Sequence, residues 1–353
     1  MAGNFKMMAK TLYGFEPILA KELRNLGAGH VEEGVRNVTF EGDTGFMYKA
    51  NLCLRTALKV FKPIKTFRVF NEIDLYRHIY DLEWPDIFDV EKTFAIDSIS
   101  NTQVFDNSMF VSLKAKDAIV DKFRAVVRDR PNVQTQDPDI RINIHIYKNT
   151  CTVSLDSSGN SLHQRGYRIL TNIAPINEVL AAGLLLKSGW DGETDFFDPM
   201  CGSGTFLIEA AMIACNIPVN INRKSYAFMH WNGYDAELHD KIVDASLKKV
   251  REFHHKIIGY DKAPSAVRKA QENVEHANLS DYITVERKDF FRADKPVEGK
   301  LHMLFNPPYG ERLPIDMEIF YGKIGDTFKK VYPGTDAWLI TSNLEALKHI
   351  GLK

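Results

Sequence analysis

The residues with the most specific chemistry stand in the run Asn306-Pro307-Pro308-Tyr309, directly after the apolar segment Leu301–Phe305. Two prolines after an asparagine form a stiff, extended loop, and Pro307 has no N–H, so its surroundings are rich in hydrogen-bond acceptors. The Asn306 side-chain oxygen and a nearby backbone carbonyl can each accept one N–H from the amino group of a base. Tyr309 can stack on the face of that base. The run indicates a site for an exocyclic amine, and a purely structural turn is the alternative.

A second candidate loop, FDPMCGSGT, lies at positions 197–205 between an expected strand and an expected helix. Glycines let the backbone pass close to a ligand, and the N-terminus of the following helix offers free N–H groups. The spacing is not the G-x-G-x-x-G of a dinucleotide-binding loop. No Gly-Lys-Ser/Thr follows, so it is not a P-loop either. Alone, the segment predicts either a ligand-binding loop or a plain tight turn. Its candidate ligand contacts are Asp198, Pro199, Cys201, Gly202, Ser203 and Gly204.

Two acidic residues follow the next two strands. Asp261 follows the expected strand Lys256–Tyr260, and an acid at the carboxyl end of a strand in an open α/β sheet can accept both hydroxyls of a ribose. Asp261 could instead cap the helix that begins near Pro264. Asp289 follows another strand and could accept an adenine amine, with Phe290 against the ring, or be an ordinary loop residue. Because four such loops follow four strands in order, they favour one functional site.

The C-terminal part must position these loops, and its pattern is strand–loop–helix alternation. Such alternation predicts a doubly wound, mostly parallel sheet. The expected strands are Asp195–Phe197, Lys256–Tyr260, Ile283–Glu286, Leu301–Phe305 and Ala337–Thr341. The expected helices are Asn177–Ser188, Thr205–Cys215, Pro264–Ala277 and Met317–Val331.

The N-terminal part alternates short strands and helices without a glycine-rich loop, which predicts small α+β modules. The expected strands are Phe5–Ala9, Val38–Glu41, Thr56–Phe61, Thr93–Ser98, Arg141–Tyr147 and Cys151–Leu155. The expected helices are Gly14–Leu26, Asp43–Asn51, Ile73–Ile79 and Ala115–Asp129. The polar run Asp156–Arg168 predicts a flexible linker between the two parts.

Composition narrows the class of protein. The 353 residues are 44% hydrophobic and 26% charged with a net charge of -1, so two or three domains are expected and any nucleic-acid surface must be local. The four cysteines show no C-x-x-C or Cys/His spacing, which argues against structural zinc and for a reducing, cytoplasmic setting. We expect no metal, no signal peptide and no membrane span.

Two clusters of basic residues are candidates for a local nucleic-acid surface, and each could equally be a solvated face. The first cluster is Lys59, Lys62, Lys65 and Arg68. The second is Lys114, Lys116, Lys122, Arg124, Arg128 and Arg130, along an expected helix. Arg165 and Arg168, which flank Tyr167, are better placed to meet substrate or cofactor.

Taken together, the motifs F-D-P-x-C-G-S-G-T, G-x-D, a loop Asp and N-P-P-Y-G resemble the class I SAM-dependent methyltransferases that methylate amines. The chain further resembles the THUMP-domain RNA guanine-N2 methyltransferases, and most closely the bacterial 23S ribosomal RNA members. That resemblance rests on LHQRGYR (162–168), APINEVLAA (174–182) and NPPYGERL (306–313). It covers nearly the whole chain.

The resemblance implies three domains: a ferredoxin-like part over 1–60, a THUMP RNA-binding domain over 61–160, and a Rossmann-like methyltransferase domain over 161–353. It implies transfer of a methyl group from S-adenosyl-L-methionine (SAM) to the N2 amine of a guanine in RNA, with 23S ribosomal RNA expected. The implied cofactor contacts are Asp198, Pro199, Cys201, Gly202, Ser203, Gly204, Asp261, Asp289 and Asn306. The implied amine-binding loop is Asn306, Pro307, Pro308 and Tyr309.

Several alternatives remain open. Within the same chemistry they are a transfer RNA guanine-N2 methyltransferase, an adenine-N6 DNA methyltransferase and a glutamine-N5 protein methyltransferase. Outside it they are a ribosome-assembly RNA-binding protein that uses SAM as a structural ligand, and a Rossmann oxidoreductase. Methylation of cytosine C5 needs a cysteine nucleophile, which the 306–309 loop lacks; Cys201 is interpreted as a small packing residue.

Two features depart from the family pattern. Asn216–Asp240 is inserted before Asp261, and its mixture of basic and aromatic residues is typical of an RNA-touching loop or of a cover over the cofactor pocket, which is the preferred interpretation. Such folds also usually finish with a strand hairpin, so a further strand is expected beyond Leu344–Ile350 to pair the sheet edge.

Overall fold

The computed structural model describes residues 3–102, 104–170, 175–308 and 316–352. The chain forms two compact units. The first unit comprises Met1–Gln164 together with Arg223–Ser246, and the second comprises Arg165–Asn222 together with Leu247–Lys353. A segment from within the expected catalytic range therefore groups with the N-terminal unit.

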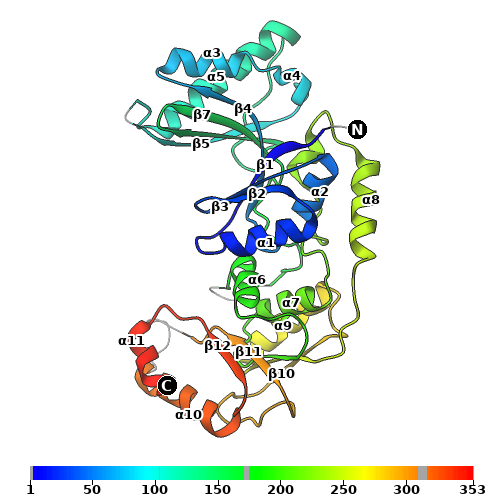
Figure 1. The fold of residues 1–353 in the computed structure, drawn as a ribbon, viewed down its shortest axis with the longest axis vertical. Helices are drawn as coiled ribbons and strands as arrows, with labels where there is room; N and C mark the ends of the chain where they lie inside the picture. The colour runs from blue at the N-terminus through cyan, green and yellow to red at the C-terminus, as the bar shows by residue number, and fades with distance from the viewer. Residues whose placement is uncertain (1–2, 103, 171–174, 309–315, 353) are drawn as a thin grey trace. The chain divides into compact units, whose positions relative to one another are not determined.

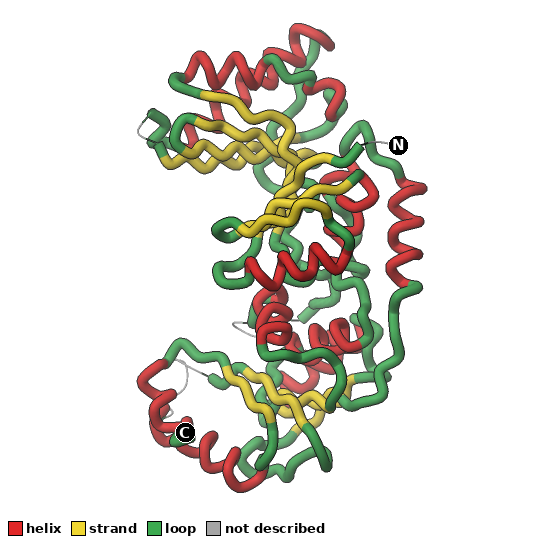
Figure 2. Tube along the Cα trace, in the orientation of Figure 1, coloured by secondary structure: helices red, strands yellow, loops and turns green. Residues whose placement is uncertain are grey.

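The strands of the first unit form one seven-stranded sheet in the order β2-β3-β1-β4-β7-β6-β5 (Figures 1 and 2). They are β1 (Phe5–Lys10), β2 (Gly29–Glu33), β3 (Asn37–Gly42), β4 (Lys59–Arg68), β5 (Phe94–Asn101), β6 (Ile140–Tyr147) and β7 (Thr150–Asp156). The central strand β4 pairs with β1 on one side and β7 on the other. Because β4 runs across position 60, the two expected N-terminal modules share one continuous sheet.

Strand β4 continues well beyond the expected end at Phe61. A proline inside a strand removes a ladder hydrogen bond and normally confines the strand to an edge or a bulge. The register of β4 against β7 shifts between Pro63 and Lys65, which is the bulge that accommodates this proline. The sequence predicted the strand over Thr56–Phe61, so its predicted end is wrong.

The helices of the first unit pack against one face of this sheet. They are α1 (Glu16–Leu26), α2 (Thr44–Cys53), α3 (Glu72–Tyr80), α4 (Trp84–Ile87) and α5 (Ser108–Val127). On β1, Met7 and Ala9 are fully buried in the core, whereas Lys6, Met8 and Lys10 alternate with them and point to the other face. We call that other face the helix-free face. Helix α5 begins earlier than expected because Asn107 accepts hydrogen bonds from the first-turn amides.

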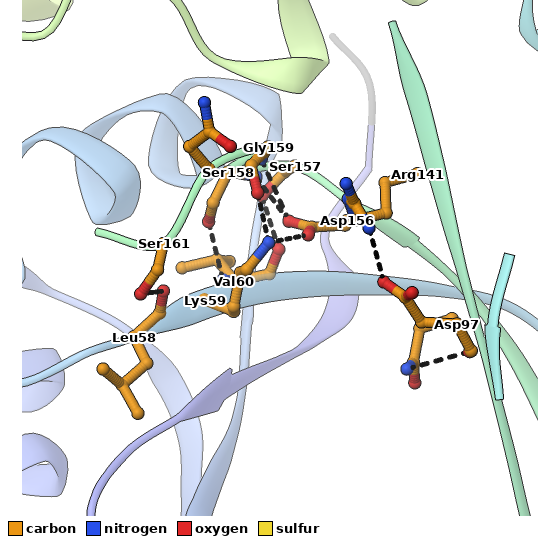
Figure 3. A network of polar contacts seen from close by, with 12 residues as sticks. Leu58, Lys59, Val60, Asp97, Arg141, Asp156, Ser157, Ser158, Gly159 and Ser161 are labelled. Atoms are coloured by element: carbon orange, nitrogen blue, oxygen red, sulfur yellow. Dashed lines mark hydrogen bonds and ion pairs between the residues drawn. The ribbon is translucent and has the colours of Figure 1, made fainter. Parts of the chain in front are cut away.

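The expected flexible linker is wrong at its start, because Asp156, Ser157 and Ser158 are buried at 1%, 0% and 0% exposure. Lys59 Nζ lies 2.5 Å from Asp156 Oδ2, and Asp156 Oδ1 accepts the amides of Ser158 and Gly159 (Figure 3). Both serine hydroxyls also bond to the buried Asn51 side chain of α2. Polar composition indicated flexibility, but here the polar groups satisfy one another inside the unit.

The inserted segment contributes to the core of the first unit. Arg223 donates hydrogen bonds to four carbonyl oxygens of the 158–164 run, those of Ser158, Asn160, Ser161 and Gln164. Beyond it lie η1 (Ala227–His230) and α8 (Ala236–Leu247). Tyr226 and Phe228 are buried in the core that α1 and α2 cover, with the Phe228 ring stacked on Tyr48 at 4.5 Å. The aromatic residues of this segment are thus core residues of the first unit.

The second unit contains a five-stranded parallel sheet in the order β10-β9-β8-β11-β12. Its strands are β8 (Asp195–Asp198), β9 (Ile257–Asp261), β10 (Ile283–Arg287), β11 (Leu301–Phe305) and β12 (Asp336–Leu339). Its helices include α6 (Glu178–Lys187), α7 (Thr205–Ala214), α9 (Pro264–His276), α10 (Met317–Val331), α11 (Leu344–Leu347) and η2 (Lys348–Ile350). The predicted α/β class and doubly wound arrangement are confirmed. Strands β8, β9 and β11, which are mostly buried and rich in apolar residues, made that part of the sequence readable.

Candidate functional site

The predicted loops meet at the carboxyl edge of the parallel sheet in the second unit. Asp198 ends β8, Asp261 ends β9, Asn306 follows β11, and Asp289 stands two residues beyond the end of β10. Strand β8 is paired with β9 on one side and with β11 on the other. Since parallel strands end at the same edge, the topology brings these four positions together, as expected.

The glycine loop between β8 and α7 is fastened to the end of β9. The Gly202 amide donates to Asp261 Oδ2 at 3.1 Å, and the Cys201 amide donates to the Tyr260 carbonyl at 2.9 Å. Gly202 and Gly204 have φ values of 55° and 83°, a region that residues with a side chain rarely adopt. The tight turn and the neighbouring strand thus hold the loop backbone against the sheet edge.

The two strand-end carboxylates lie in a poorly solvated place. Burial raises the pKa of Asp198 well above its usual range, and the charge of Asp261 raises it further. Burial also raises the pKa of Asp261. Asp198 Oδ1 accepts the Met200 amide at 3.0 Å, so this acid shapes the turn of the loop itself. Asp261 Oδ1 accepts the Ala263 amide at 2.9 Å.

The alternative role for Asp261, capping the next helix, does not match the structure. The N-cap of α9 is Ala263, and no side chain caps it in the described part of the chain. Asp261 instead bridges the end of its own strand and the glycine loop. A carboxylate in that position can accept hydroxyl groups from a ligand that lies across the loop.

Helix α7 begins directly at the glycine loop with an open N-terminus. Its N-cap is Gly204, and no described side chain accepts its first-turn amides. Free N–H groups and the helix dipole favour an anionic ligand group at this point. Of the other predicted contacts, Pro199, Cys201 and Ser203 are buried. Burial raises the pKa of the Cys201 thiol well above its usual range, in agreement with a packing role.

The amine-binding loop is described only in part. Asn306 Oδ1 is buried and has no hydrogen-bond partner among the described residues. Pro307 is buried, and Pro308 is half-buried. Tyr309, the fourth predicted member, lies outside the described residues, as do the remaining residues of the 306–313 motif. A buried carbonyl oxygen without a donor costs free energy, so Asn306 is poised to accept a donor from a ligand.

Asp289 and Phe290 behave differently from one another. Phe290 is 2% exposed and packs against Phe305 and Tyr332, so it is a core residue and is not free to cover an adenine ring. Asp289 is half-buried, and its Oδ1 accepts the Phe291 amide at 3.0 Å. A groove of about 600 Å³ runs along β9 and β10 and includes Asp289, but none of the other predicted cofactor contacts lines it.

The arginines before α6 are internal, contrary to the expectation for Arg165. The Arg165 and Glu209 side chains are both fully buried and paired at 3.2 Å, and the Tyr167 hydroxyl donates to the same carboxylate. Arg168 is less buried; it pairs with Glu178 at 3.2 Å and donates to Thr205 Oγ1 at 2.8 Å. Arg168 thus contacts the helix that the glycine loop begins.

Sequence reasoning missed Asn273 on α9, whose side chain is buried and bonded to the glycine loop. The available signal was a polar residue inside an apolar helix stripe. Ala270 and Val274 are buried on either side of it, and only a satisfied amide would be tolerated there.

The second basic cluster is largely neutralised within its own unit. Along α5, Lys114, Lys116, Lys122 and Arg124 each pair with a carboxylate. In the first cluster, Lys59 pairs with the buried Asp156, and Lys65 donates to the His78 carbonyl. Most of these residues therefore have partners within their own unit. In the described ranges, no three His, Cys, Asp or Glu side chains are grouped as metal ligands would be, and no helix is long and apolar enough to cross a bilayer.

The parallel sheet, the glycine loop held by Asp261 and the Asn-Pro-Pro loop place the second unit among the class I methyltransferases. Family comparison agrees: residues 165–351 match the RMKL-like methyltransferase domain, residues 70–156 the THUMP domain, and residues 6–61 the RlmL ferredoxin-like domain. The chain belongs to the RMKL-like methyltransferase family and is a THUMP-containing, SAM-dependent RNA methyltransferase.

Solved structures agree on the fold and the cofactor. A Listeria monocytogenes protein described as a predicted N6-adenine-specific DNA methylase is 28% identical, with a TM-score of 0.89 over 99% of this chain and 92% of its own. A Clostridium difficile protein described as a methylase is 30% identical, with a TM-score of 0.87 over 99% and 93%. The protein SMU.472, described as a methyltransferase and solved with SAH, is 29% identical, with a TM-score of 0.86 over 100% of this chain and 93% of its own.

Proposed function

We propose that this enzyme methylates the exocyclic N2 amine of a guanine in RNA, with 23S ribosomal RNA as the substrate. The observation that carries the proposal is the buried Asn306 carbonyl oxygen, which has no donor among the described residues and lies at the sheet edge that the glycine loop shares. An amine with two N–H groups supplies the donors that this loop needs.

The chain's own residues match the parts of SAM. The Asp261 carboxylate would accept the ribose hydroxyls, while the open N-terminus of α7 and the glycine loop would receive the methionine carboxylate. Asp289 would accept the adenine amine. This last assignment rests on position alone, because Phe290 lies in the core and does not assist it.

The catalytic contribution we assign to the amine loop is alignment. SAM, when bound, supplies an activated methyl group. Asn306 Oδ1 accepts one N–H of the target amine, and a carbonyl of the loop accepts the other, which turns the nitrogen lone pair away from both acceptors. Guanine N2 is a poor nucleophile because its lone pair is delocalised into the ring, so acceptors that draw the amine out of conjugation lower the barrier. Pro307 stiffens the loop and keeps a competing N–H out of it.

We further propose that RNA binds on the helix-free face of the first unit. Lys10 and Arg68 lie on this face, and neither has a carboxylate partner among the described residues. Burial lowers the pKa of Lys10, so its ammonium group is incompletely solvated and gains from a phosphate partner. The match of residues 70–156 to the THUMP domain supports the same unit as the RNA-binding part.

Adenine N6 is the second candidate, because the Listeria monocytogenes neighbour is described as acting on adenine in DNA. The Asn-Pro-Pro loop serves either amine. The ferredoxin-like and THUMP matches, which cover the first unit, favour RNA over DNA.

The decisive experiment incubates the protein with labelled SAM and with unmodified ribosomal RNA, transfer RNA or duplex DNA, then digests each and identifies the methylated nucleoside. N2-methylguanosine from 23S RNA, lost in Asn306→Ala, supports the proposal. The same product from transfer RNA would keep the chemistry and overturn the substrate, and N6-methyladenine from DNA would overturn both. Incorporation into none of them would contradict the proposal as a whole.

A further inference from the structure

The Asn273 side chain on α9 joins two separate backbone segments around the glycine loop. Its Oδ1 accepts the amides of Ile169 and Leu170, each at 3.1 Å. Its Nδ2 donates to the Leu170 carbonyl at 2.9 Å and to the Ser203 carbonyl at 3.0 Å. The residue is 1% exposed. Both ends of one buried amide are thus fully used, with one contact in the glycine loop and three in the segment before α6.

Hydrogen bonds of Arg168 also connect the glycine loop with the segment before α6. Arg168, directly before Ile169, donates to Thr205 Oγ1 at 2.8 Å and to the Ile176 carbonyl at 2.9 Å. Its guanidinium also pairs with Glu178 in the first turn of α6. Thr205 is the first residue of α7, so Arg168 contacts the end of the glycine loop opposite to the Asp261 contact at Gly202.

The glycine loop depends on hydrogen bonds from residues outside it to stay ordered. Glycines at 202 and 204 are required by the positive φ values of the turn, and glycine has the largest conformational freedom to lose. A loop that is ordered only when ligand binds spends part of the binding free energy on its own ordering. Contacts that hold the loop beforehand leave that free energy to affinity.

We propose that Asn273 is a positioning residue for the cofactor. It holds the glycine loop and the 168–170 segment in one arrangement before SAM binds, with the Arg168–Thr205 contact as its counterpart. Asn273 touches neither cofactor nor substrate in this role. It acts by fixing the Ser203 carbonyl and the backbone beside it. The inference rests on the proposed placement of SAM at the glycine loop.

The test compares Asn273→Leu with Gln271→Ala. Leucine branches at Cγ as asparagine does but makes none of the four hydrogen bonds. Gln271 lies on the same helix and donates one side-chain hydrogen bond, to the Val285 carbonyl in β10, away from the loop. We expect Asn273→Leu to weaken SAM binding about tenfold or more in calorimetry at a temperature where circular dichroism shows a folded protein. Gln271→Ala should bind SAM as the unaltered protein does.

Kinetics separate positioning from simple stability. For Asn273→Leu we expect KM for SAM to rise while kcat at saturating SAM stays within a fewfold of the unaltered enzyme, because the loss occurs in binding. A lower melting temperature with unchanged SAM affinity and KM would overturn the proposal, as would equal losses in the two variants. If Asn273→Leu does not fold, Thr205→Val decides, since it removes only the Arg168 contact and must also weaken SAM binding.

Binding of SAM and methylation of RNA are measured separately, so the two proposals can fail separately. Unaltered protein that binds SAM but methylates no RNA would overturn the proposed function and leave the role of Asn273 standing. Unaltered SAM affinity in both Asn273→Leu and Thr205→Val, with RNA methylation present, would overturn the role of Asn273 and leave the proposed function standing.

Discussion

Asp261 Oδ2 lies 3.1 Å from the Gly202 amide nitrogen, so the acid at the end of β9 holds the glycine loop as well as facing the proposed ribose position. Replacing Asp261 should therefore remove two kinds of contact at once. For Asp261→Ala we expect SAM affinity to fall by roughly 100-fold, since hydrogen bonds to a charged group are worth about 1.5–3 kcal/mol each. Asp261→Asn keeps one acceptor and should lose less. Calorimetric titration with SAM measures both; equal losses would contradict the dual role.

Asn306 should act on catalysis far more than on folding. For Asn306→Ala we expect methyl transfer at saturating SAM to fall by roughly 100-fold or more, the usual cost of removing one preorganised polar contact from a reacting group. The melting temperature should not fall, because the Asn306 oxygen makes no hydrogen bond within the described chain. A stopped assay with labelled SAM, beside a thermal melt, checks both parts. A large loss of stability would mean that Asn306 is structural.

Charge reversal on the helix-free face should weaken RNA binding. For Lys10→Glu combined with Arg68→Glu we expect RNA affinity at about 0.1 M salt to fall at least tenfold, with a shallower dependence of affinity on salt, because fewer phosphates are neutralised. Lys122→Glu is the matched control, since Lys122 lies on α5 and is already paired with Glu83. Filter binding across a salt series measures the slopes. Should the control lose as much affinity, the RNA would bind on the helical side.

Glu178 should make stability depend on pH. Burial raises the pKa of Glu178 from 4.5 to about 7, although Arg168 opposes the shift. Glu209 raises it further and Arg165 lowers it. Between those two pH values the folded state binds the proton more tightly than the unfolded chain does. The free energy of unfolding should therefore fall as pH rises from 4.5 to 7, by at most about 3 kcal/mol.

Urea denaturation of the protein and of Glu178→Gln at several pH values tests this dependence. The glutamine variant should show a flatter curve in the same window, whatever its absolute stability. Glu237→Gln is a suitable control, because Glu237 is exposed on α8 and pairs only with Lys241 in the described structure. Parallel curves for the protein and Glu178→Gln would rule out Glu178 as the titrating group.

Arg223 should stabilise the first unit through its hydrogen bonds to a segment about 60 residues earlier in the chain. Arg223→Met removes the hydrogen bonds to the four carbonyls of the 158–164 run, and we expect the first unit to lose about 2–4 kcal/mol. Lys241→Met, at an exposed lysine on α8, should be nearly neutral. Denaturation followed by the fluorescence of the first unit's tryptophans, Trp84 and Trp231, reports the difference. A neutral result for Arg223→Met would mean that the linker is held without it.

The catalytic half was more readable from sequence than the N-terminal half, and the reason is physical. Buried parallel strands are continuous apolar runs, and the polar residues at their carboxyl ends, such as Asp198 and Asn306, stand out directly after them. In the first unit the same reasoning missed β2, ended β4 at Phe61 instead of Arg68, and began α5 seven residues late. Those errors come from short strands, a bulge and a capped helix start, where local pattern is weakest.

Sequence reasoning found the positions of some site residues and missed or misassigned others. Asp261 and the glycine loop could be placed because their spacing follows strand order. Asn273 could not, because its role comes from contacts with residues 70 and more positions away. Phe290 was predicted to lie against the adenine ring, but it packs in the core. An aromatic residue next to a loop acid can do either, and the local sequence does not distinguish the two.

The grouping of Arg223–Ser246 with the first unit has a consequence for how the protein is made. Residues 226–242 supply part of the core beneath α1 and α2. During synthesis from the N-terminus, the ribosome must therefore produce about the first third of the catalytic unit before the leading unit can complete its own interior. A gene fragment ending at Gln164 would encode every strand of that unit's sheet and still yield a protein with an unfinished core.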